Sequence, residues 1–294
     1  MVNIDRWFQE LSVFPSTNSK PLLIAEIGIN HNGDIELAKK LVKMSYENGC
    51  DFVKFQKRNP EVCVPTHKRN ELKNTPWGSM TYLEYKKRIE FGKSEFLEIE
   101  KYCTEVGIQW SASAWDLESQ DFVFNFNVPF NKVASAMNTN YDFIEKVAKE
   151  GKVTFVSTGM SEMNEIEKCV KVFEKYGCPY ILMHTVSTYP ANDEDLNLAV
   201  IKTLQNKFGV PVGYSGHESS VSPSIIAATL GAVVIERHVT LDRTMWGTDQ
   251  SASLEGNGIR QLSKVLERIP KVIGSPEKKF IESEKKAAAN LRYW

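Results

Sequence analysis

The sequence predicts an α/β fold, a (β/α)8 TIM barrel with an N-terminal extension and a long insertion after the second strand. Eight short apolar runs alternate with amphipathic stretches of helix length along the 294 residues. A barrel of this kind commonly takes about 250 residues. No G-x-G-x-x-G turn follows the first apolar run, which disfavours an open dinucleotide-binding sheet. We therefore expect an extension at 1–20, a barrel at 21–275 and a charged tail at 276–294.

The individual elements follow from the alternation of these patterns. Strands are expected at Leu22–Ile29, Asp51–Gln56, Gln109–Ala114, Asn131–Ala136, Val153–Ser157, Tyr180–Val186, Val210–Tyr214 and Val233–His238. Helices are expected at Ile35–Asn48, Phe96–Glu105, Tyr141–Lys149, Met163–Tyr176, Leu196–Lys207, Ser222–Leu230 and Gly256–Ile269. The extension is expected to contain one short helix and a strand. The insertion at 58–92, with a helix within Ser79–Arg88, is interpreted as a lid or an oligomer contact, because long loops in compact domains are usually functional.

Composition excludes several classes of partner. The chain has 36 basic and 37 acidic residues, a net charge of −1, so nothing indicates binding to nucleic acid or to an anionic membrane. The first residues are too acidic for a secretory signal, and no apolar run has the length of a membrane helix. The five cysteines are odd in number and lack metal-binding spacing. They are expected to be reduced thiols of a cytoplasmic protein.

A strand–helix–strand unit at Pro211–Gln250 places two histidines together. His217 and His238 each follow an apolar run, and the helical stretch Ser222–Leu230 lies between them, closed by Gly231. The carboxyl ends of parallel strands meet at one edge, so the two imidazoles are expected side by side. This arrangement favours a divalent-metal site. The alternative is two unrelated histidines, one in a turn and one in the core.

Two lysines fall inside predicted strands, where an ammonium group is costly to bury without a counter-charge. These are Lys54 and Lys132, and hydroxyl side chains also follow the strands, at Ser113, Ser135, Ser187 and Ser215. Lysines together with hydroxyls are typical of an anion site, and phosphate is the anion that we expect. The alternative is that each lysine pairs with a nearby carboxylate such as Glu26.

The polar blocks at the strand ends resemble those of the sialic acid synthase family, phosphoenolpyruvate-condensing enzymes that make N-acetylneuraminate and related nonulosonates. The blocks run in family order from Leu22 to Gln250. They are AEIGINHNGD (25–34), DFVKFQK (51–57), TPWGSMTYLEYKKRIEF (75–91), SASAWD (111–116), KVASA (132–136), VSTGM (156–160), HTVSTYP (184–190), VGYSGHE (212–218) and IERHVTLDR (235–243).

The resemblance implies a role for each of the residues singled out above. A divalent metal, expected to be Mn²⁺ with Mg²⁺ or Co²⁺ as alternatives, is bound by His217 and His238. Phosphoenolpyruvate is bound by Lys54, Ser113, Lys132, Ser135, Ser187 and Ser215. The acceptor sugar is bound by Glu26, Gln56, Tyr189 and Asp249. The residues expected to be catalytic are Glu26, Lys54, Lys132, His217 and His238, and Glu26→Gln is expected to lower turnover strongly with little effect on folding.

The implied activity is that of a transferase that forms a carbon–carbon bond. The enol carbon of phosphoenolpyruvate attacks the metal-polarised aldehyde of N-acetylmannosamine or a related 2-acetamido sugar. Water then adds at C2 and phosphate leaves. Family members commonly form homodimers, which is expected here too. The family's C-terminal antifreeze-like domain has no counterpart before Trp294. The acceptor is therefore expected to be held differently or covered by a separate lid polypeptide.

Three other functions stay open. The product could be a legionaminate- or pseudaminate-type acid, made from a different acetamido sugar. The chain could be a 3-deoxy-sugar-acid 8-phosphate synthase, whose phosphorylated acceptor would need an additional basic pocket. The insertion offers basic residues for one at Arg58, Lys68, Arg69 and Lys73. The third alternative is a non-catalytic barrel that binds a sugar.

Overall fold

The computed structural model describes residues 1–11 and 19–294 and has a closed barrel of eight parallel strands in that part of the chain. The strands are β1 (Leu22–Gly28), β2 (Phe52–Lys57), β5 (Gln109–Ala114), β6 (Asn131–Val133), β7 (Thr154–Ser157), β8 (Tyr180–Thr185), β9 (Val212–Gly216) and β10 (Val234–His238). They close in the order β1-β10-β9-β8-β7-β6-β5-β2. The predicted TIM barrel is confirmed.

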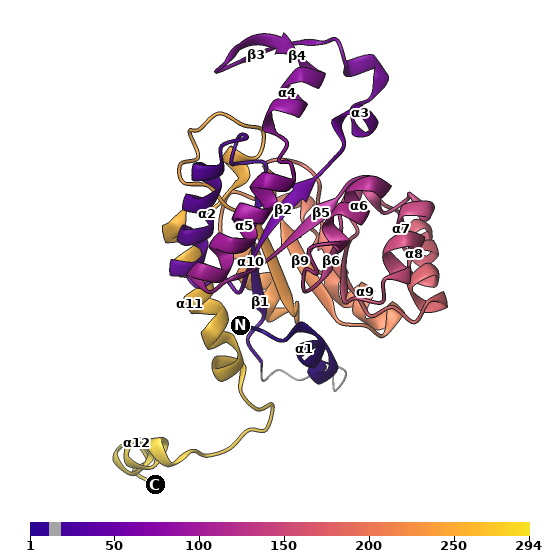
Figure 1. The fold of residues 1–294 in the computed structure, drawn as a ribbon. Coiled ribbons are helices and arrows are strands. Elements are labelled where there is room, and N and C mark those ends of the chain that lie inside the picture. The colour runs from indigo at the N-terminus through magenta and orange to yellow at the C-terminus, as the bar shows by residue number, and fades with distance from the viewer. Residues whose placement is uncertain (12–18) are drawn as a thin grey trace.

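Helices surround this barrel (Figure 1). They are α2 (Ile35–Glu47), α5 (Lys93–Val106), α6 (Leu117–Phe124), α7 (Tyr141–Lys149), α8 (Met163–Lys175), α9 (Val200–Phe208), α10 (Ser222–Thr229) and α11 (Gly256–Ile273). Helix α6 was not predicted. The Asp116 side chain caps it by accepting a hydrogen bond from the Ser119 amide at 2.8 Å.

Two predicted strands were wrong at their ends. The fourth was expected to reach Ala136, but β6 ends at Val133 and the short 3₁₀ turn η2 (Ser135–Met137) follows. The Met137 amide donates to the Ala134 carbonyl at 2.8 Å, so these groups turn the chain instead of extending the ladder. The seventh strand begins and ends two residues later than expected, because its last residue, Gly216, still pairs with β10.

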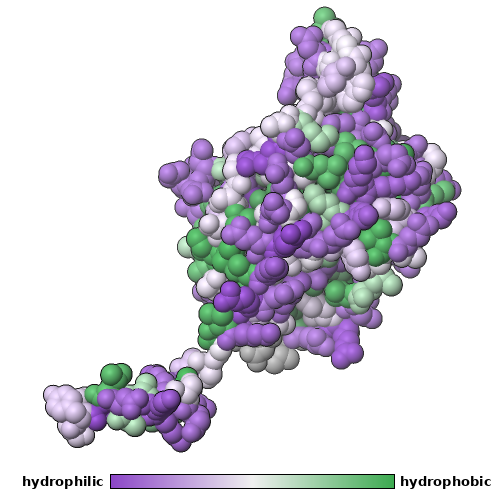
Figure 2. Space-filling model, turned by 90° about the vertical axis from the view of Figure 1, so that its left-hand side faces the viewer, coloured by the Kyte–Doolittle hydropathy of each residue, from purple (hydrophilic) through white to green (hydrophobic). Residues whose placement is uncertain are grey.

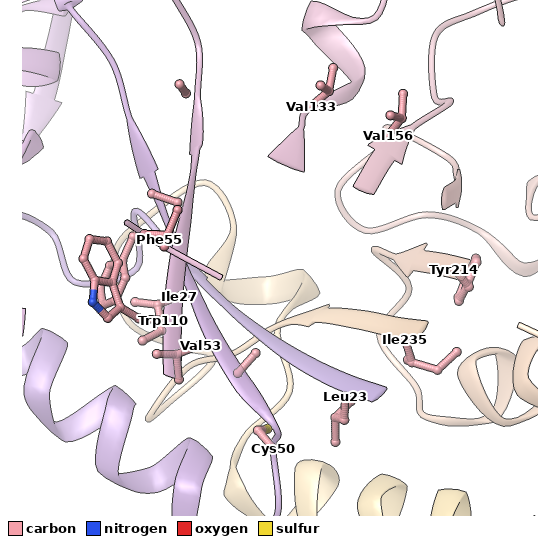
Figure 3. Packing of buried hydrophobic residues seen from close by; sticks show 14 of the residues in the cluster. Leu23, Ile27, Cys50, Val53, Phe55, Trp110, Val133, Val156, Tyr214 and Ile235 are labelled. Atoms are coloured by element: carbon pink, nitrogen blue, oxygen red, sulfur yellow. The ribbon is translucent and has the colours of Figure 1, made fainter. Parts of the chain in front are cut away.

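Side chains on the strands alternate between two hydrophobic clusters. Outward-facing residues such as Leu23, Val53 and Ile235 pack against the helices (Figure 3). Inward-facing residues fill the N-terminal part of the barrel, at Ile24, Phe52, Phe130, Phe155, Met183 and Val234. Two positions further along the same six strands, the inward residue is polar, at Glu26, Lys54, Lys132, Ser157, Thr185 and Glu236. The barrel therefore has an apolar lower interior and a polar upper one.

The N-terminal helix α1 (Ile4–Leu11) lies below the barrel, at the end opposite the polar interior (Figure 1). Its buried Ile4 and Leu11 join the apolar cluster inside the barrel. The helix predicted for the extension is confirmed, and its packing explains how the lower opening is closed. The strand predicted for the extension is absent at 1–11 and 19–20, and residues 12–18 lie outside the described part.

The insertion stands out from the strands' C-terminal end of the barrel (Figures 1 and 2). It contains α3 (Pro60–Cys63), the 3₁₀ turn η1 (Thr66–Lys68), the hairpin β3 (Leu72–Thr75) and β4 (Gly78–Thr81), and α4 (Tyr82–Ile89). The predicted helix within Ser79–Arg88 is confirmed from Tyr82 onward. It begins there because Thr81 and Glu84 form a capping box, with the Thr81 amide donating to the Glu84 carboxylate at 2.8 Å.

The C-terminal tail leaves α11 and carries the short helix α12 (Lys285–Leu291) away from the barrel (Figures 1 and 2). Its apolar residues, such as Phe280 and Leu291, are exposed. The boundaries of the extension, barrel and tail at residues 20 and 275 stay a prediction. Within the described residues, no helix combines the length and apolar character needed to cross a membrane.

Candidate active site

A cavity of about 300 Å³ opens at the C-terminal ends of the barrel strands. Nearly all the residues predicted for the site line it: Glu26, Lys54, Gln56, Ser113, Lys132, Ser135, Ser187, Tyr189, Ser215, His217 and His238. Asp249 does not line the cavity, but its carboxylate lies 3.8 Å from His238 Nδ1. Residues that were not predicted as site residues also line it: Trp115, Ala134, Ala136, Ser157, Met160, Thr185 and Glu236.

Strand register brings these side chains together. Glu26 of β1 pairs with His238 of β10 on one side and with Lys54 of β2 on the other. Because side chains two residues apart share a face, Gln56 lies on the same side as Lys54, and Glu236 on the same side as His238. The closure of the barrel thus joins residues that are more than 200 positions apart in the chain.

Both interior lysines have carboxylate partners. The Lys54 ammonium contacts Glu26 and lies 3.9 Å from Glu236, and Lys132 lies 3.5 Å from Glu236. Lys132 also donates to Ser157 Oγ at 2.7 Å. The pairing with carboxylates, given above as the alternative, is present in the structure, and the binding of an anion by the same lysines stays a prediction. The physical reason for the pairing is the cost of an uncompensated buried charge, and both lysine side chains are only 3% exposed.

Burial and neighbouring charges shift the pKa values of Glu236 and Lys132. Burial alone raises the pKa of Glu236, but the nearby Lys132 and Lys54 outweigh it and hold that pKa below its usual range. Burial lowers the pKa of Lys132, and Glu236 opposes this shift. The two lysines and two glutamates therefore form a charge-balanced cluster, which we call the floor of the site.

The predicted serines differ in how they are bonded. Ser113 accepts a hydrogen bond from Lys54 at 3.4 Å, and Ser215 donates to Glu236 at 3.0 Å. The buried Ser187 hydroxyl has no hydrogen-bond partner. A Cβ atom placed on Gly159 would lie 2.4 Å from Ser187 Oγ and 2.8 Å from Ser135 Oγ, so only glycine leaves these two hydroxyls their space. An unpaired buried hydroxyl facing a cavity is suited to a polar ligand.

The two predicted metal ligands lie side by side, with ring centroids 5.5 Å apart. His217 Nδ1 lies 2.6 Å from the Val186 carbonyl, which can only accept, so Nδ1 carries the proton and Nε2 keeps its lone pair. Burial, aided by His238, lowers the pKa of His217 to about 3. His217 is therefore neutral at physiological pH, which is the ligating form of imidazole.

The surroundings of the histidines also fit a metal. His238 Nδ1 is buried without a hydrogen-bond partner. Among the described residues, no group of three or more His, Cys, Asp or Glu side chains is arranged to hold an ion. These two histidines would therefore supply only part of a coordination shell, and substrate oxygens or water would complete it.

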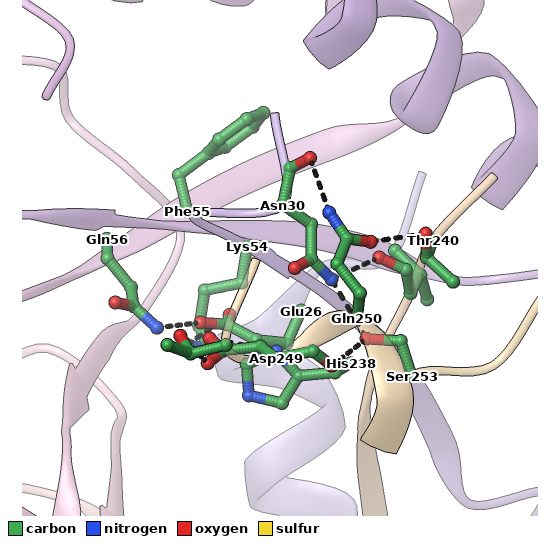
Figure 4. Close-up of polar contacts among 12 residues, drawn as sticks. Glu26, Asn30, Lys54, Phe55, Gln56, His238, Thr240, Asp249, Gln250 and Ser253 are labelled. Carbon is green, nitrogen blue, oxygen red and sulfur yellow. Dashed lines mark hydrogen bonds and ion pairs between the residues drawn. The ribbon is translucent and has the colours of Figure 1, made fainter. Parts of the chain in front are cut away.

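The residues predicted to bind the acceptor lie on the outer side of the floor. Gln56 donates to Glu26 at 2.8 Å, and the Tyr189 ring packs on His217 with centroids 4.1 Å apart. Asp249 is positioned by its own backbone carbonyl, which accepts a hydrogen bond from Ser253 at 2.7 Å. Ser253 in turn accepts from Asn30 Nδ2 at 2.8 Å (Figure 4). Asn30 thus ties the loop that carries Asp249 to the end of β1.

A comparison with known families agrees with this geometry. The model of the NeuB family matches residues 41–278, which is most of the chain. The chain belongs to the NeuB family.

Relatives of this NeuB chain have several names. It is 38% identical to human N-acetylneuraminate-9-phosphate synthase over 89% of this chain and 74% of that protein. It is 36% identical to N,N'-diacetyllegionaminic acid synthase of Campylobacter jejuni over 91% of this chain and 81% of that protein. A crystal structure of the N-acetylneuraminic acid synthetase of Leptospira borgpetersenii, in complex with citrate, matches with a TM-score of 0.83 and 32% identity. That match covers 94% of both chains.

Sequence reasoning missed the part that Glu236 plays in this NeuB site. The position of Glu236 two residues before His238 on the same strand could have identified it, because this spacing places both side chains on the inner face. It also missed the buried pair of Glu218 and Arg237, which lie 2.8 Å apart and are each only 1% exposed. Arg237 donates to the Ser220 carbonyl at 2.8 Å, so this pair fixes the loop that follows His217.

Proposed function

We propose that this protein condenses phosphoenolpyruvate with a 2-acetamido sugar and releases phosphate. The observation that carries the proposal is a single cavity that holds two lysines, the unpaired hydroxyl of Ser187 and two imidazoles, of which His217 is neutral. The names of the relatives, synthases of N-acetylneuraminate 9-phosphate and of diacetyllegionaminic acid, support the same reaction type.

Phosphoenolpyruvate would bind on the floor of the site. Lys54 and Lys132 are already held in place by Glu26 and Glu236, so little reorganisation is needed when the anionic ligand arrives. The hydroxyls of Ser135 and Ser187 both lie next to Gly159. The Ser187 hydroxyl has no hydrogen-bond partner, so it could donate to the ligand without breaking an existing bond. Ser113 and Ser215 complete the polar wall.

In this proposal Glu26 would lie between the two substrates. It contacts Lys54 on the phosphoenolpyruvate side and Gln56 on the acceptor side. We propose that its carboxylate stabilises the positive charge that develops at C2 of phosphoenolpyruvate, or accepts the proton of the water that adds there. Gln56, Tyr189 and Asp249 would orient the acceptor so that its aldehyde carbon faces the enol carbon, because fixing two reactants in line removes much of the barrier.

His217 and His238 would hold a divalent metal, which we propose to be Mn²⁺, with Mg²⁺ or Co²⁺ as alternatives. When bound, such an ion supplies Lewis-acid polarisation of the acceptor's aldehyde oxygen. The Val186 carbonyl fixes the tautomer of His217, so that its Nε2 faces a ligand in the neutral form.

The identity of the acceptor separates the remaining enzyme functions. Identities of 38% to a 9-phosphate synthase and 36% to a legionaminic acid synthase do not decide between them. N-acetylmannosamine or its phosphate is the first choice, and the precursor of a legionaminate-type acid is the second. A homodimer, a separate lid polypeptide and a cytoplasmic location are further parts of the proposal. The five cysteines, all free, support a reducing compartment.

The test is a metal-controlled assay of phosphate release from phosphoenolpyruvate in the presence of N-acetylmannosamine or its 6-phosphate. We expect release that needs Mn²⁺ and disappears in His217→Ala, because one imidazole cannot hold the ion. The matched control is His67→Ala, which removes an exposed histidine from the insertion and should release phosphate at the normal rate. No release with any acetamido sugar, although the protein binds the metal, would refute the proposed reaction.

A further inference from the structure

Three cations of the insertion, outside the residues that line the cavity, differ from the lysines of the floor. Arg58, Lys73 and Lys86 belong to the insertion, and none forms an ion pair within 4.0 Å with a carboxylate of the described residues. We call these three residues the rim cations. Their contacts are with aromatic rings and, for Arg58, with one side-chain amide. They are therefore cations without a directly paired carboxylate.

Contacts connect Arg58 directly to the predicted acceptor site. Its guanidinium donates to Gln56 Oε1 and stacks 4.1 Å above the ring of Trp115. Gln56 and Trp115 both line the cavity. Since Gln56 donates to Glu26, and Glu26 contacts Lys54, an unbroken series of contacts runs from the floor out to Arg58.

The two lysines are held beside Arg58 by aromatic packing. The ammonium of Lys73 lies 4.7 Å from the centre of the Tyr85 ring, and that of Lys86 lies 5.2 Å from the same ring. Trp246, on the loop that leads to Asp249, packs against Tyr85 with centroids 5.2 Å apart. Two cations on one buried ring leave little freedom to move apart.

The electrostatics of Lys86 show that these cations are close enough to repel one another. Burial lowers the pKa of Lys86 to about 8, and the charges of Arg58 and Lys73 add to this shift, while Asp249 and Glu90 oppose it. Glu90 is already engaged, because it pairs with Lys57 at 2.9 Å. A dianion bound among the rim cations would remove this repulsion.

We propose that the acceptor is a phosphorylated 2-acetamido sugar and that Arg58, Lys73 and Lys86 bind its phosphate. This inference rests on the proposed condensation reaction. The reacting aldehyde must face the histidines and the floor, so the opposite end of the sugar extends past Gln56 toward the rim. A phosphate at that end would meet the guanidinium fork of Arg58 and the ammonium groups of the lysines. This phosphate stays on the product, unlike the one released from phosphoenolpyruvate.

The test compares kcat/KM for N-acetylmannosamine with that for its 6-phosphate. We expect the wild type to prefer the phosphorylated sugar by tenfold or more. In Lys86→Met and in Lys73→Met this preference should fall by about tenfold, the loss of one charged contact. Lys86→Arg, which keeps the charge, should retain the preference. Lys87→Met is the matched control, because Lys87 is the next residue of α4 but pairs with Glu61 on the surface.

The possible outcomes separate three cases. If the rim lysines only brace the aromatic cluster, Lys86→Met would lower the melting temperature and leave the preference unchanged, and the inference would be wrong. Equal use of both sugars by the wild type would also overturn it, while the proposed condensation would stand. Absence of turnover with either sugar would refute the condensation itself, and the inference with it.

Discussion

The cations of the floor and the cations of the rim have different neighbours. Lys54 and Lys132 are buried and each contacts a glutamate, whereas Lys86 and Arg58 contact aromatic rings and an amide. A lysine buried away from water needs a counter-charge even without a ligand, because nothing else offsets the free-energy cost of desolvating its ammonium group. The rim cations instead contact ring faces, and burial there lowers the pKa of Lys86 to about 8.

The difference separates two tasks within one site. The floor is neutral as a whole, so it is stable without a ligand and arranged for a substrate used in every turnover. The rim keeps a positive charge that only an anionic group can neutralise, so it is suited to choosing among acceptors. The insertion supplies the rim, and the barrel strands supply the floor.

The largest effect is expected when one of the two lysines of the floor is removed. In Lys132→Met the rate of phosphate release should fall on the order of 10²- to 10³-fold, because a positioned donor to the anion is lost. The free energy of unfolding should fall by about 3 kcal/mol, since Glu236 loses its nearer lysine and keeps Lys54 at 3.9 Å and the hydrogen bond from Ser215. Assays of phosphate release and urea unfolding measure the two effects.

The control for Lys132→Met is Lys149→Met, which breaks an exposed pair with Glu145. An exposed pair of this kind contributes between about 0 and 1 kcal/mol, so this variant should remain active and nearly as stable as the wild type. Equal stability of Lys132→Met and Lys149→Met would show that Glu236 becomes protonated when its partner is lost, and that the floor is not held by charge balance.

Glu26→Gln should have the second largest effect. Turnover should fall by about 10²-fold, because the carboxylate that faces C2 is neutralised. The sequence-based expectation of little effect on folding has to be revised, because Glu26 is the partner of buried Lys54. We expect a loss of about 1–3 kcal/mol, limited by the remaining contacts of Lys54 with Glu236 and Ser113.

The exposed pair of Glu167 and Lys207, 2.6 Å apart, provides the control for Glu26→Gln. Glu167→Gln should change neither turnover nor the urea midpoint noticeably. If Glu26→Gln kept near-normal turnover, the assignment of Glu26 to the reacting centre would be wrong, whatever its effect on stability.

The sequence predicted the barrel and most of the cavity lining because both depend on local patterns. Apolar runs reveal strands, and polar residues at their ends reveal the upper interior. It could not show that Glu236 would pair with both lysines, because that depends on how β10 and β6 face one another across the closed barrel. The contact of Lys54 with Glu26 likewise depends on the register of β1 against β2.

The rim was even less accessible from sequence. Arg58 and Lys73 were recognised only as basic residues of a loop, together with Lys68 and Arg69, and Lys86 was not singled out. What distinguishes Lys86 is the packing of Tyr85 against Trp246, which lie 161 positions apart in the chain. The closure of the lower barrel by α1 depends in the same way on contacts that no local pattern encodes.

A pH profile should give the smallest and most specific effect. Lys86 has a pKa of about 8 in the free protein, so its ammonium charge is present below pH 8 and is lost as the pH rises through that value. A sugar phosphate becomes a dianion above its second pKa, about 6. The preference for the phosphorylated sugar should therefore be greatest near pH 7 and fall above pH 8. At pH 9 about one tenth of Lys86 stays charged, so a fall of roughly threefold to tenfold is expected.

The ratio of kcat/KM for the two sugars is the quantity to measure, because titration of the floor affects both sugars alike and cancels. Lys86→Met should show a ratio that no longer falls between pH 8 and 9, whereas Lys87→Met should follow the wild type. The charged groups that face Lys86 are Arg58, Lys73, Asp249 and Glu90, and Lys73 is the other lysine among them. Lys73→Met should therefore retain the fall above pH 8 if Lys86 is its source. A wild-type ratio that stayed constant from pH 7 to 9 would remove Lys86 from the recognition of the acceptor, and would leave Arg58 and Lys73 as the remaining candidates for its phosphate.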